Sequence, residues 1–425
     1  MNIVTLCVFE DDYYENFLPM TYTKPVFDLI CGSKTLLERM LAELRPQKVL
    51  LFTRDYLREK LIEKTSFIVN EVDVEGETLI VNGRLLVDFE TASILCSMKL
   101  GEALICEDTL VAMKLGEGVA RGALANKIFE PRLVKSFANI KEVSLKLVKY
   151  PWQLIELTSE LLNEVSSLGE EYNNDEIKIL GDPKMLRVAG DVQVEGPVVV
   201  DVRRGPVYIG KNCLIEGYTK IEGPTYIGNE TIIRGAYIRS KCYIGKVCRI
   251  GFGSELEETI ISSFTNKQHA GFIGHSYVGE WVNIGAGTNV SDLKNTYGTV
   301  KVSVRDSMID SGHVKLGCFI GDYVKTSIGT QIYSGKKIGP FSHVHGIVYD
   351  DVPPFTIWAK SLGFKPVELR LESVIETQKR MYERRGVVQT KADVELIKRL
   401  FELTSEERAR RGVGKELFRL GQSSY

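Results

Sequence analysis

The sequence predicts a left-handed parallel β-helix over residues 185–350, with an α/β domain before it and a helical tail after it. Three observations predict this architecture: a six-residue period of aliphatic residues, glycines that follow many of them, and different patterns on either side. A period of six fits neither an amphipathic helix nor an alternating strand. It fits a triangular coil in which one aliphatic side chain points inward at each step, and each coil buries its apolar face against the next.

The period consists of small aliphatic residues at corresponding positions. They are Ile209, Ile215, Ile221, Ile227, Ile233, Ile238, Ile244 and Ile250, then Val278, Ile284 and Val290, then Val302, Met308, Val314 and Ile320, and finally Ile332, Ile338 and Val344. Ordinary short strands in a sandwich are the alternative, but they have no reason to keep one register over so many steps. Two stretches, 262–272 and 287–298, break the register, so we expect them to leave the coil as loops, where binding chemistry concentrates.

The regions on either side have their own patterns. Residues 1–170 alternate strand-like segments (3–9 and 48–53) with helix-like segments (35–44), which predicts an α/β layer with a mainly parallel sheet. The polar stretch 169–176 is a plausible linker. Residues 353–425 are rich in charge and predict helices, most clearly at 376–386 and 392–412.

Composition narrows the class of protein. A chain of 425 residues is long enough for two or three domains, and its formal net charge of −2 gives no global attraction to nucleic acid or to a membrane surface. The first residues form no signal peptide, and no apolar run approaches the roughly 20 residues of a membrane span. The eight cysteines are scattered without a CxxC pair, so we expect reduced thiols in a cytoplasmic protein.

The densest group of polar residues lies between 266 and 295, and all five histidines lie in the repeat region, at 269, 275, 313, 343 and 345. His275 follows an Ile-Gly pair, which predicts a place at a coil corner beside a loop. An imidazole there is suited to take a proton from an amine at neutral pH. A surface histidine without a role is the alternative. His343 and His345 alternate as metal ligands do, but no cysteine or carboxylate accompanies them, so we expect no metal site.

The segment GHSYVGEWVNIGAGT (274–288) resembles the acetyltransferase half of the bifunctional glucosamine-1-phosphate acetyltransferase/N-acetylglucosamine-1-phosphate uridyltransferase family. Those enzymes also have a nucleotidyltransferase domain followed by a hexapeptide β-helix. The resemblance implies that His275 is the general base and that Tyr277 and Asn283 contact the sugar phosphate. It also implies that Ala286, Ser327 and Gly346 bind acetyl-CoA, the co-substrate, in a groove between the subunits of a homotrimer.

The chain departs from this family at several positions. It has Asp292-Leu293 where the family has Asn-Tyr, and Arg249-Ile250-Gly251 where the family has Arg-Leu-Arg. Lys267 is an approximate counterpart of the lysine that grips the sugar phosphate. We include Arg249, Lys267, Asp292 and Lys294 among the candidate substrate-binding residues.

The N-terminal domain also carries a resemblance. FLPMTYTKPVFDLICG resembles the stretch after the phosphate loop of sugar nucleotidyltransferases, with Lys24 at the signature lysine. However, residues 10–16 contain no glycine, so their backbone cannot cradle phosphates in the usual way. Arg84 stands where an aspartate would bind Mg²⁺, and an arginine cannot do so. Across nearly the whole chain, these motifs resemble a divergent branch of sugar nucleotidyltransferases.

The leading hypothesis is a homotrimeric transferase that moves an acyl group from acetyl-CoA to the amine of an amino-sugar phosphate or a nucleotide amino sugar. A second hypothesis places sugar-1-phosphate nucleotidylyl transfer in the N-terminal domain, where Asp11, Lys24 and Arg84 would form a rearranged site. Only this reaction would need Mg²⁺. A third hypothesis is a trimer that binds a nucleotide sugar without catalysis. None of the three includes nucleic acid or a membrane as a partner.

Overall fold

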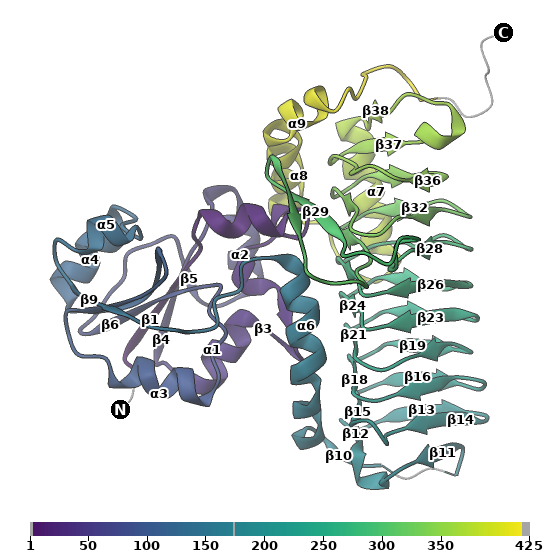
Figure 1. Ribbon diagram of the computed structural model, residues 1–425, viewed down its shortest axis with the longest axis horizontal. Coiled ribbons are helices and arrows are strands. Elements are labelled where there is room, and N and C mark those ends of the chain that lie inside the picture. The colour runs from purple at the N-terminus through teal and green to yellow at the C-terminus, as the bar shows by residue number, and fades with distance from the viewer. Residues whose placement is uncertain (1–2, 173–174, 419–425) are drawn as a thin grey trace. The chain divides into compact units, whose positions relative to one another are not determined.

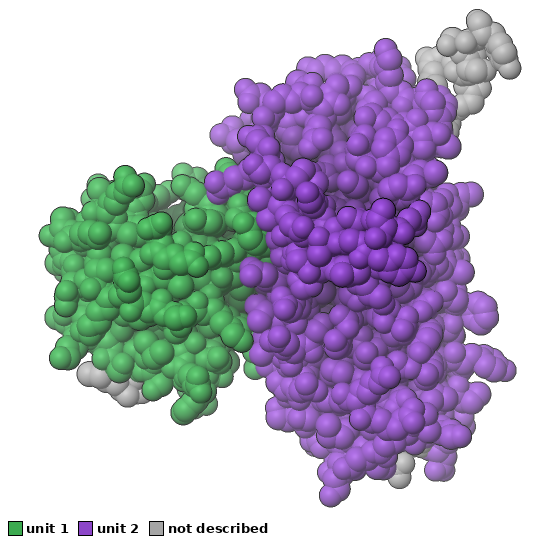
Figure 2. All heavy atoms as spheres, viewed as in Figure 1, with its two compact units in different colours: residues 1–17, 23–150 green, residues 18–22, 151–425 purple. Residues whose placement is uncertain are grey.

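The computed structural model describes residues 3–172 and 175–418, which form two compact units (Figure 2). The first unit contains the chain up to Phe17 and Thr23–Tyr150. The second contains Leu18–Tyr22 and the chain from Pro151 onward. Helix α6 (Pro151–Leu161) therefore belongs to the second unit, although it precedes the expected domain boundary at residue 170.

The first unit is built on a seven-stranded mixed sheet with the order β5-β4-β1-β6-β8-β7-β9. Its strands are β1 (Thr5–Phe9), β4 (Lys48–Phe52), β5 (Ile68–Val69), β6 (Thr78–Asn82), β7 (Glu102–Cys106), β8 (Thr109–Leu115) and β9 (Asn139–Glu142). Its helices are α1 (Leu36–Leu44), α2 (Arg58–Lys64), α3 (Phe89–Ser97), α4 (Glu117–Ala125) and α5 (Pro131–Val134). The central strand β1 pairs in parallel with β4 and β6, which confirms the predicted α/β layer.

Short elements complete this unit. They are the 3₁₀ helices η1 (Asp12–Phe17), η3 (Val26–Asp28) and η4 (Asp55–Leu57) and the hairpin of β2 (Ile30–Cys31) and β3 (Lys34–Thr35). The 3₁₀ helix η1 follows β1 directly, where a glycine-rich phosphate loop would stand. Its position decides what the carboxyl end of the sheet can bind.

The second unit is a parallel β-helix whose coils stack along one axis (Figure 1). Each coil has three sides, which we name A, B and C in chain order. Side A contains β12 (Leu186–Val188), β15 (Val207–Ile209), β18 (Thr225–Ile227), β21 (Cys242–Ile244), β24 (Ile260–Ile261), β27 (Tyr277–Val278), β31 (Phe319–Ile320) and β34 (Lys337–Ile338). At the start of the stack, β10 (Glu170–Glu171) pairs with β12 in antiparallel orientation.

Sides B and C are built in the same way. Side B contains β13 (Val192–Glu195), β16 (Cys213–Glu216), β19 (Ile232–Arg234), β22 (Arg249–Ile250), β25 (Asn266–Lys267), β32 (Lys325–Thr326), β35 (His343–Val344) and β37 (Thr356–Trp358). Side C contains β11 (Ile177–Leu180), β14 (Val198–Asp201), β17 (Lys220–Glu222), β20 (Tyr237–Ile238), β23 (Ser254–Glu257), β26 (Gly271–Gly274), β28 (Asn289–Val290), β33 (Gln331–Ile332) and β36 (Ile347–Val348).

The predicted period matches the core of this coil. The side chains at Ile209, Ile227, Ile244, Ile320 and Val344 are all fully buried in one continuous cluster. Because each inward side chain packs on those of the coils above and below, stability builds up along the axis. The outward-facing residues do not contribute to this core, so their identity can vary from coil to coil. Outward-facing residues at corresponding positions of successive coils lie next to one another.

Two of the predicted departures from the coil are wrong in detail. The stretch 262–272 stays in the coil, because it forms β25 and begins β26; its inward position is Lys267, so no aliphatic residue marked the register. The stretch 287–298 leaves the coil only after Asp292 and returns near Lys315, where Leu293 bridges Lys315.

The prediction that Val302, Met308 and Val314 are inward positions of the coil is also wrong. These residues lie in an insertion that contains the antiparallel hairpin of β29 (Lys301–Val304) and β30 (Ser307–Asp310). Met308 is 57% exposed, as a hairpin residue and not an inward coil residue would be. The agreement with a six-residue period in this stretch is a coincidence of spacing.

The predicted helical tail is confirmed as α7 (Leu371–Glu383), α8 (Lys391–Leu403) and α9 (Ser405–Arg410). The antiparallel strand β38 (Val367–Glu368) joins them to the last coil. The linker predicted at 169–176 contains β10, and residues 173–174 lie outside the described residues. No helix in the described chain is long and apolar enough to cross a bilayer.

Candidate functional site

His275 lies at the corner between sides C and A, between β26 and β27. Its backbone adopts a left-handed conformation with a φ of 47°, which is uncommon for a residue with a side chain. Its N–H donates to the carbonyl of Glu257 at 2.9 Å, and its carbonyl accepts from the N–H of Gly317 at 2.9 Å. The corner is therefore fixed from both neighbouring coils, and the residue is only 9% exposed.

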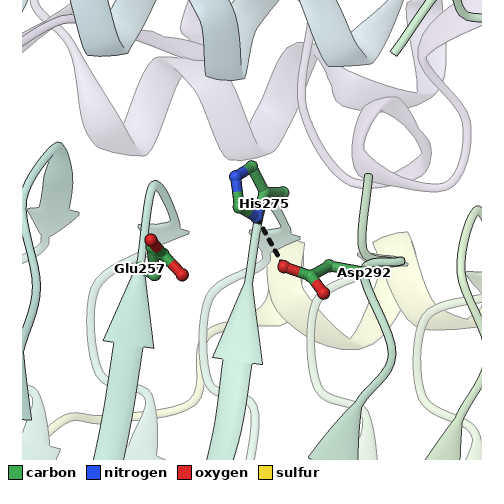
Figure 3. Close-up of side chains that lie close together, drawn as sticks. All are labelled: Glu257, His275 and Asp292. Carbon is green, nitrogen blue, oxygen red and sulfur yellow. Dashed lines mark hydrogen bonds and ion pairs between the residues drawn. The ribbon is translucent and has the colours of Figure 1, made fainter. Parts of the chain in front are cut away.

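Asp292 occupies the same corner one coil further along, and its carboxylate meets the imidazole. The Oδ2 atom lies 2.8 Å from Nδ1 of His275 (Figure 3). Burial would raise the pKa of Asp292, but the hydrogen bond with His275 and the positive charge of Lys315 hold that pKa below its ordinary value. Asp292 is therefore a carboxylate that orients the imidazole through Nδ1 and leaves Nε2 for a ligand.

Two glutamates lie at the preceding coil on the other side of His275. The Oε2 atom of Glu258 is 3.5 Å from Nε2 of His275, and the carboxylate of Glu257 lies nearby (Figure 3). Each glutamate has a cation of its own: Glu257 pairs with Arg239 at 2.8 Å, and Glu258 pairs with Lys241 at 2.6 Å. The imidazole thus stands between carboxylates from both neighbouring coils.

The same corner contains the group of described residues that comes nearest to a metal-ligand set. One atom each from Glu257, His275 and Asp292 lies within 4.8 Å of the others. A cation there would compete with Arg239 for Glu257 and with the Nδ1 hydrogen for Asp292. The arrangement therefore suits an imidazole–carboxylate pair better than it suits a metal ion.

The other candidate substrate residues are not all brought to this corner. Tyr277 follows His275 closely on β27 but is only 2% exposed, on the side against which α6 packs. Lys267 lies inside the coil with no exposure, its ammonium donates to the carbonyl of His269, and burial lowers its pKa to about 8. The ammonium of Lys294 donates to the carbonyl of Thr299 within the insertion at 2.6 Å.

The candidate acetyl-CoA residues meet at another corner, between sides B and C. Asn283, Ala286 and Ser327 line a groove of about 340 Å³ together with Gln268 and His269. Gly346 lies at this corner beyond the residues that line the groove and accepts from the N–H of Gln331. The four residues of β26 separate this corner from His275, a distance of roughly 13 Å at about 3.3 Å per residue.

Arg249 lies on side B, away from His275. Its Nη1 atom donates to the carbonyls of Glu230 and Cys248 at 2.8 and 2.9 Å. It lines a second hollow, of about 400 Å³, that also contains Gln268. The structure therefore does not gather the candidate residues of one chain: His275 with Asp292, the groove and Arg249 lie at different positions around the coil.

In the first unit, Asp11 and Arg84 meet at the carboxyl ends of β1 and β6, where ligands bind in sheets of this kind. Arg84 is fully buried, and its Nε and Nη2 atoms donate to the two carboxylate oxygens of Asp11 at 2.8 and 2.6 Å. Asn82 donates to the same carboxylate at 2.8 Å, and Arg84 also donates to the carbonyl of Val148. Tyr13 of η1 lies over the guanidinium at 4.4 Å.

A second ion pair lies beside the first. Arg54 donates to both oxygens of Glu10 at 2.9 and 3.1 Å, and its guanidinium lies 4.0 Å from the ring of Tyr14. Arg54 also donates to the backbone carbonyl of Lys24 at 2.9 Å. The predicted trio of Asp11, Lys24 and Arg84 is thus held by internal contacts, with both oxygens of Asp11 already bonded.

Comparison with known proteins agrees with the two-part architecture. Residues 6–170 match the family model described as sugar nucleotidyl transferase. A bifunctional sugar-1-phosphate nucleotidylyltransferase/acetyltransferase of Sulfurisphaera tokodaii is 36% identical over 110 residues, which cover 26% of this chain and 27% of the relative. The bifunctional protein GlmU of Methanococcus maripaludis is 28% identical over 192 residues, which cover 45% and 41% of the two chains.

A further GlmU protein, from Methanocaldococcus jannaschii, is 34% identical over 104 residues, covering 24% of this chain and 25% of the relative. Part of the chain is thus similar to part of these bifunctional proteins. The matched part spans about a quarter to two fifths of the length of these GlmU-like relatives. The family model itself covers the N-terminal part of the chain.

The sequence reasoning missed Glu257, Glu258 and Arg239, and it placed Asp292 on the substrate and not on His275. One signal could have found the carboxylates, because one coil takes about 17 residues. Glu258 precedes His275 by 17 positions, and Asp292 follows it by 17. Residues one coil apart share a corner, so this spacing predicts their contact.

The ion pair in the first unit gives a stability prediction. Replacing Arg84 by Met leaves the carboxylate of Asp11 without its partner in a largely buried place, so we expect a loss of about 3–5 kcal/mol in the free energy of unfolding. The double variant Asp11→Leu/Arg84→Met removes both charges and is expected to regain most of that loss. Urea denaturation followed by circular dichroism measures both changes.

The matched control is Lys127→Met, which breaks an exposed ion pair with Asp55 at 3.1 Å. An exposed pair of this kind contributes less than about 1 kcal/mol. Equal losses of unfolding free energy for Arg84→Met and Lys127→Met would contradict the conclusion that the buried Asp11–Arg84 pair stabilises this end of the sheet.

Proposed function

We propose that the chain is a cytoplasmic transferase of nucleotide-sugar metabolism whose β-helix moves an acetyl group from acetyl-CoA to the amine of an amino-sugar phosphate or nucleotide amino sugar. The observation that carries this proposal is the His275–Asp292 pair, an imidazole whose Nδ1 atom is hydrogen-bonded to a carboxylate and whose Nε2 atom lies 3.5 Å from Glu258. A coil corner needs no such pair for its own stability. The likeness to bifunctional nucleotidylyltransferase/acetyltransferases supports the same reaction class.

In the proposed reaction, His275 acts as the general base and Asp292 stabilises its protonated form. The amine nitrogen attacks the thioester carbonyl carbon while Nε2 of His275 takes the amine proton. The C–S bond then breaks, and the imidazolium returns that proton to the leaving thiolate. Asp292 stabilises the imidazolium through Nδ1, as a carboxylate does in other acid–base pairs. Glu258, 3.5 Å from Nε2, makes this position attractive for a cationic amine before it loses its proton.

The acyl donor is proposed to lie in the groove of Asn283, Ala286 and Ser327, where backbone N–H groups would hold the oxyanion that forms at the thioester. Within one chain this groove is a whole side of the triangle away from His275. We therefore propose a homotrimer in which His275 of one copy faces the groove of the next. Heterologous contacts that close into a ring give such shared sites.

Sugar-1-phosphate nucleotidylyl transfer in the first unit is a second candidate, favoured by the match of residues 6–170 to the sugar nucleotidyl transferase family. Both oxygens of Asp11 are bonded by Arg84, so this carboxylate does not fit the role of a Mg²⁺ ligand. Release of pyrophosphate from a nucleoside triphosphate by the wild type, and its loss in Lys24→Ala, would support this candidate.

The central test of acyl transfer is the variant His275→Gln. We expect a 10²–10⁴-fold loss of kcat, because glutamine cannot accept the amine proton while it keeps much of the volume of the imidazole. The measurement is release of free thiol from acetyl-CoA with glucosamine-1-phosphate and a panel of other amino-sugar phosphates. His313→Gln, which changes a histidine of the insertion, serves as the matched control and is expected to keep wild-type activity. Thiol release that does not depend on His275, or none with any acceptor, would refute the proposal.

The second test concerns Asp292. Asp292→Asn keeps an acceptor for the Nδ1 hydrogen but removes the charge that favours the imidazolium, so the acid limb of the pH–activity profile should move to lower pH. Asp292→Ala also removes the acceptor, and we expect a roughly 10–100-fold loss of kcat. A pH profile that is the same in Asp292→Asn and the wild type would show that the carboxylate does not act through His275.

A further inference from the structure

Side B of the coil presents a column of polar and basic side chains with no acidic member. Arg249, Asn266, Asn283, Lys325 and His343 stack in successive coils as partners in the parallel ladder. Neighbouring strands lie about 4.8 Å apart, so successive side chains of the column are close neighbours. Such a column gives the surface a positive potential along the coil axis.

The C-terminal helices cover one end of this column and leave the other open. Residues of α7 enclose Lys325 and His343, together with Tyr323 and Phe341. Burial, and then the positive charge of Lys325, lower the pKa of His343 to about 3. The covered end is therefore neutral at His343 and partly buried, so Arg249, Asn266 and Asn283 are the more open part of the column.

The helices are held in place by an aromatic column at the corner between sides A and B. Tyr382 of α7 inserts between Trp281 and Tyr323, with ring centroids 4.5 and 6.3 Å away, and its hydroxyl lies 2.7 Å from that of Tyr323. The hydroxyl of Tyr382 also donates to Asp393 of α8. This anchor fixes the residues that follow α7 against side B.

Arg385 follows α7 and lies at the open end of the column. Its Nη2 atom donates to Oδ1 of Asn266 at 2.7 Å. Its Nε atom is buried and has no hydrogen-bond partner among the residues that the structure describes. An unpaired buried donor on a charged group is costly, so its presence points to an acceptor that a ligand supplies.

Arg249 has hydrogen-bond partners but no ion-pair partner among the described residues. Its Nη1 atom donates to two backbone carbonyls, and burial and the charge of Arg385 lower its pKa. In the described chain, neither Arg249 nor Arg385 forms an ion pair with a carboxylate within 4.0 Å. Glu230 lies near enough to act on Arg249 through its charge, but it forms no ion pair with it. Two neighbouring guanidinium groups without an ion-paired carboxylate favour binding of an anion.

The hollow beside Arg249 indicates the rest of the ligand. It holds about 400 Å³ and is lined by Arg234, whose charge is paired with Glu216 of the same hollow, and by the rings of Tyr218 and Phe252, which are 83% and 74% exposed. The Phe252 ring lies against Gly235, where a Cβ atom would stand only 2.5 Å from it. An aromatic face beside a pair of arginines suits a nucleobase next to its phosphates.

We propose that Arg385, carried by the C-terminal helices, joins Arg249 and Asn266 in a binding site for the diphosphate of a nucleotide. The site gives the helical extension a function in ligand binding, and Arg385 supplies a second arginine beside the single arginine of Arg249-Ile250-Gly251. Coenzyme A and a nucleotide sugar both carry such a diphosphate, so the chemistry is shared between two sources.

The test is isothermal titration calorimetry on the full-length protein, with coenzyme A and with UDP-N-acetylglucosamine as separate probes. Arg385→Gln and Arg249→Gln should each weaken binding of at least one probe by tenfold or more, which corresponds to about 1.4 kcal/mol. Arg380→Gln, an exposed arginine of α7 paired with Glu376, is the matched control and should stay within twofold of the wild type. Melting temperatures establish that the variants are folded, and Arg249→Gln tests the site without touching the helices.

The probe whose binding is weakened by the substitutions identifies the source of the diphosphate. Wild-type-like affinity for both probes in both variants, or equal weakening in Arg380→Gln, would overturn the proposal. Binding is measured without turnover, so this result and the His275 result can fail independently of each other.

Discussion

The stacking of one coil on the next is the constraint on which the rest of this structure depends. Each coil buries its inward residues only against its neighbours, so the backbone positions repeat closely and corresponding residues are placed one above the other. This repetition brings Glu258, His275 and Asp292 to one corner, although 34 residues separate the first from the last. The corner is rigid because its backbone groups bond to both adjacent coils, and a rigid corner holds an imidazole in one orientation.

The six-residue period was sufficient to predict the coil and its core, and the charged helical segments predicted α7, α8 and α9. The same reasoning failed where the inward residue is not aliphatic, as at Lys267, and where an insertion happens to repeat at six residues, as at Met308. Contacts between successive coils depend on the number of residues in a whole coil. The 17-residue spacing of Glu258, His275 and Asp292 therefore predicts their contact, and the six-residue period does not. Arg385 lies outside the repeat, and no sequence period indicates that α7 would bring it to Asn266.

The first unit illustrates how a fold can persist while its ligand site changes. Its central strands pair as predicted, and its sequence matches the sugar nucleotidyl transferase family. The carboxyl end of β1, however, is occupied by two internal ion pairs, Asp11 with Arg84 and Glu10 with Arg54. The absence of glycine from residues 10–16 predicted that the segment could not cradle phosphates, but only the structure shows the side chains that fill the space.

The central claim is that acyl transfer uses His275 from one copy and the groove at Ala286 from another. Co-expression of His275→Ala and Ala286→Trp chains, purified through two different tags, tests it most directly. Each variant alone should release no thiol from acetyl-CoA, whereas hybrid trimers should recover about one third of the wild-type activity, because each contains one complete site in three. Hybrid trimers without activity would contradict the claim that the two halves of the site come from different copies.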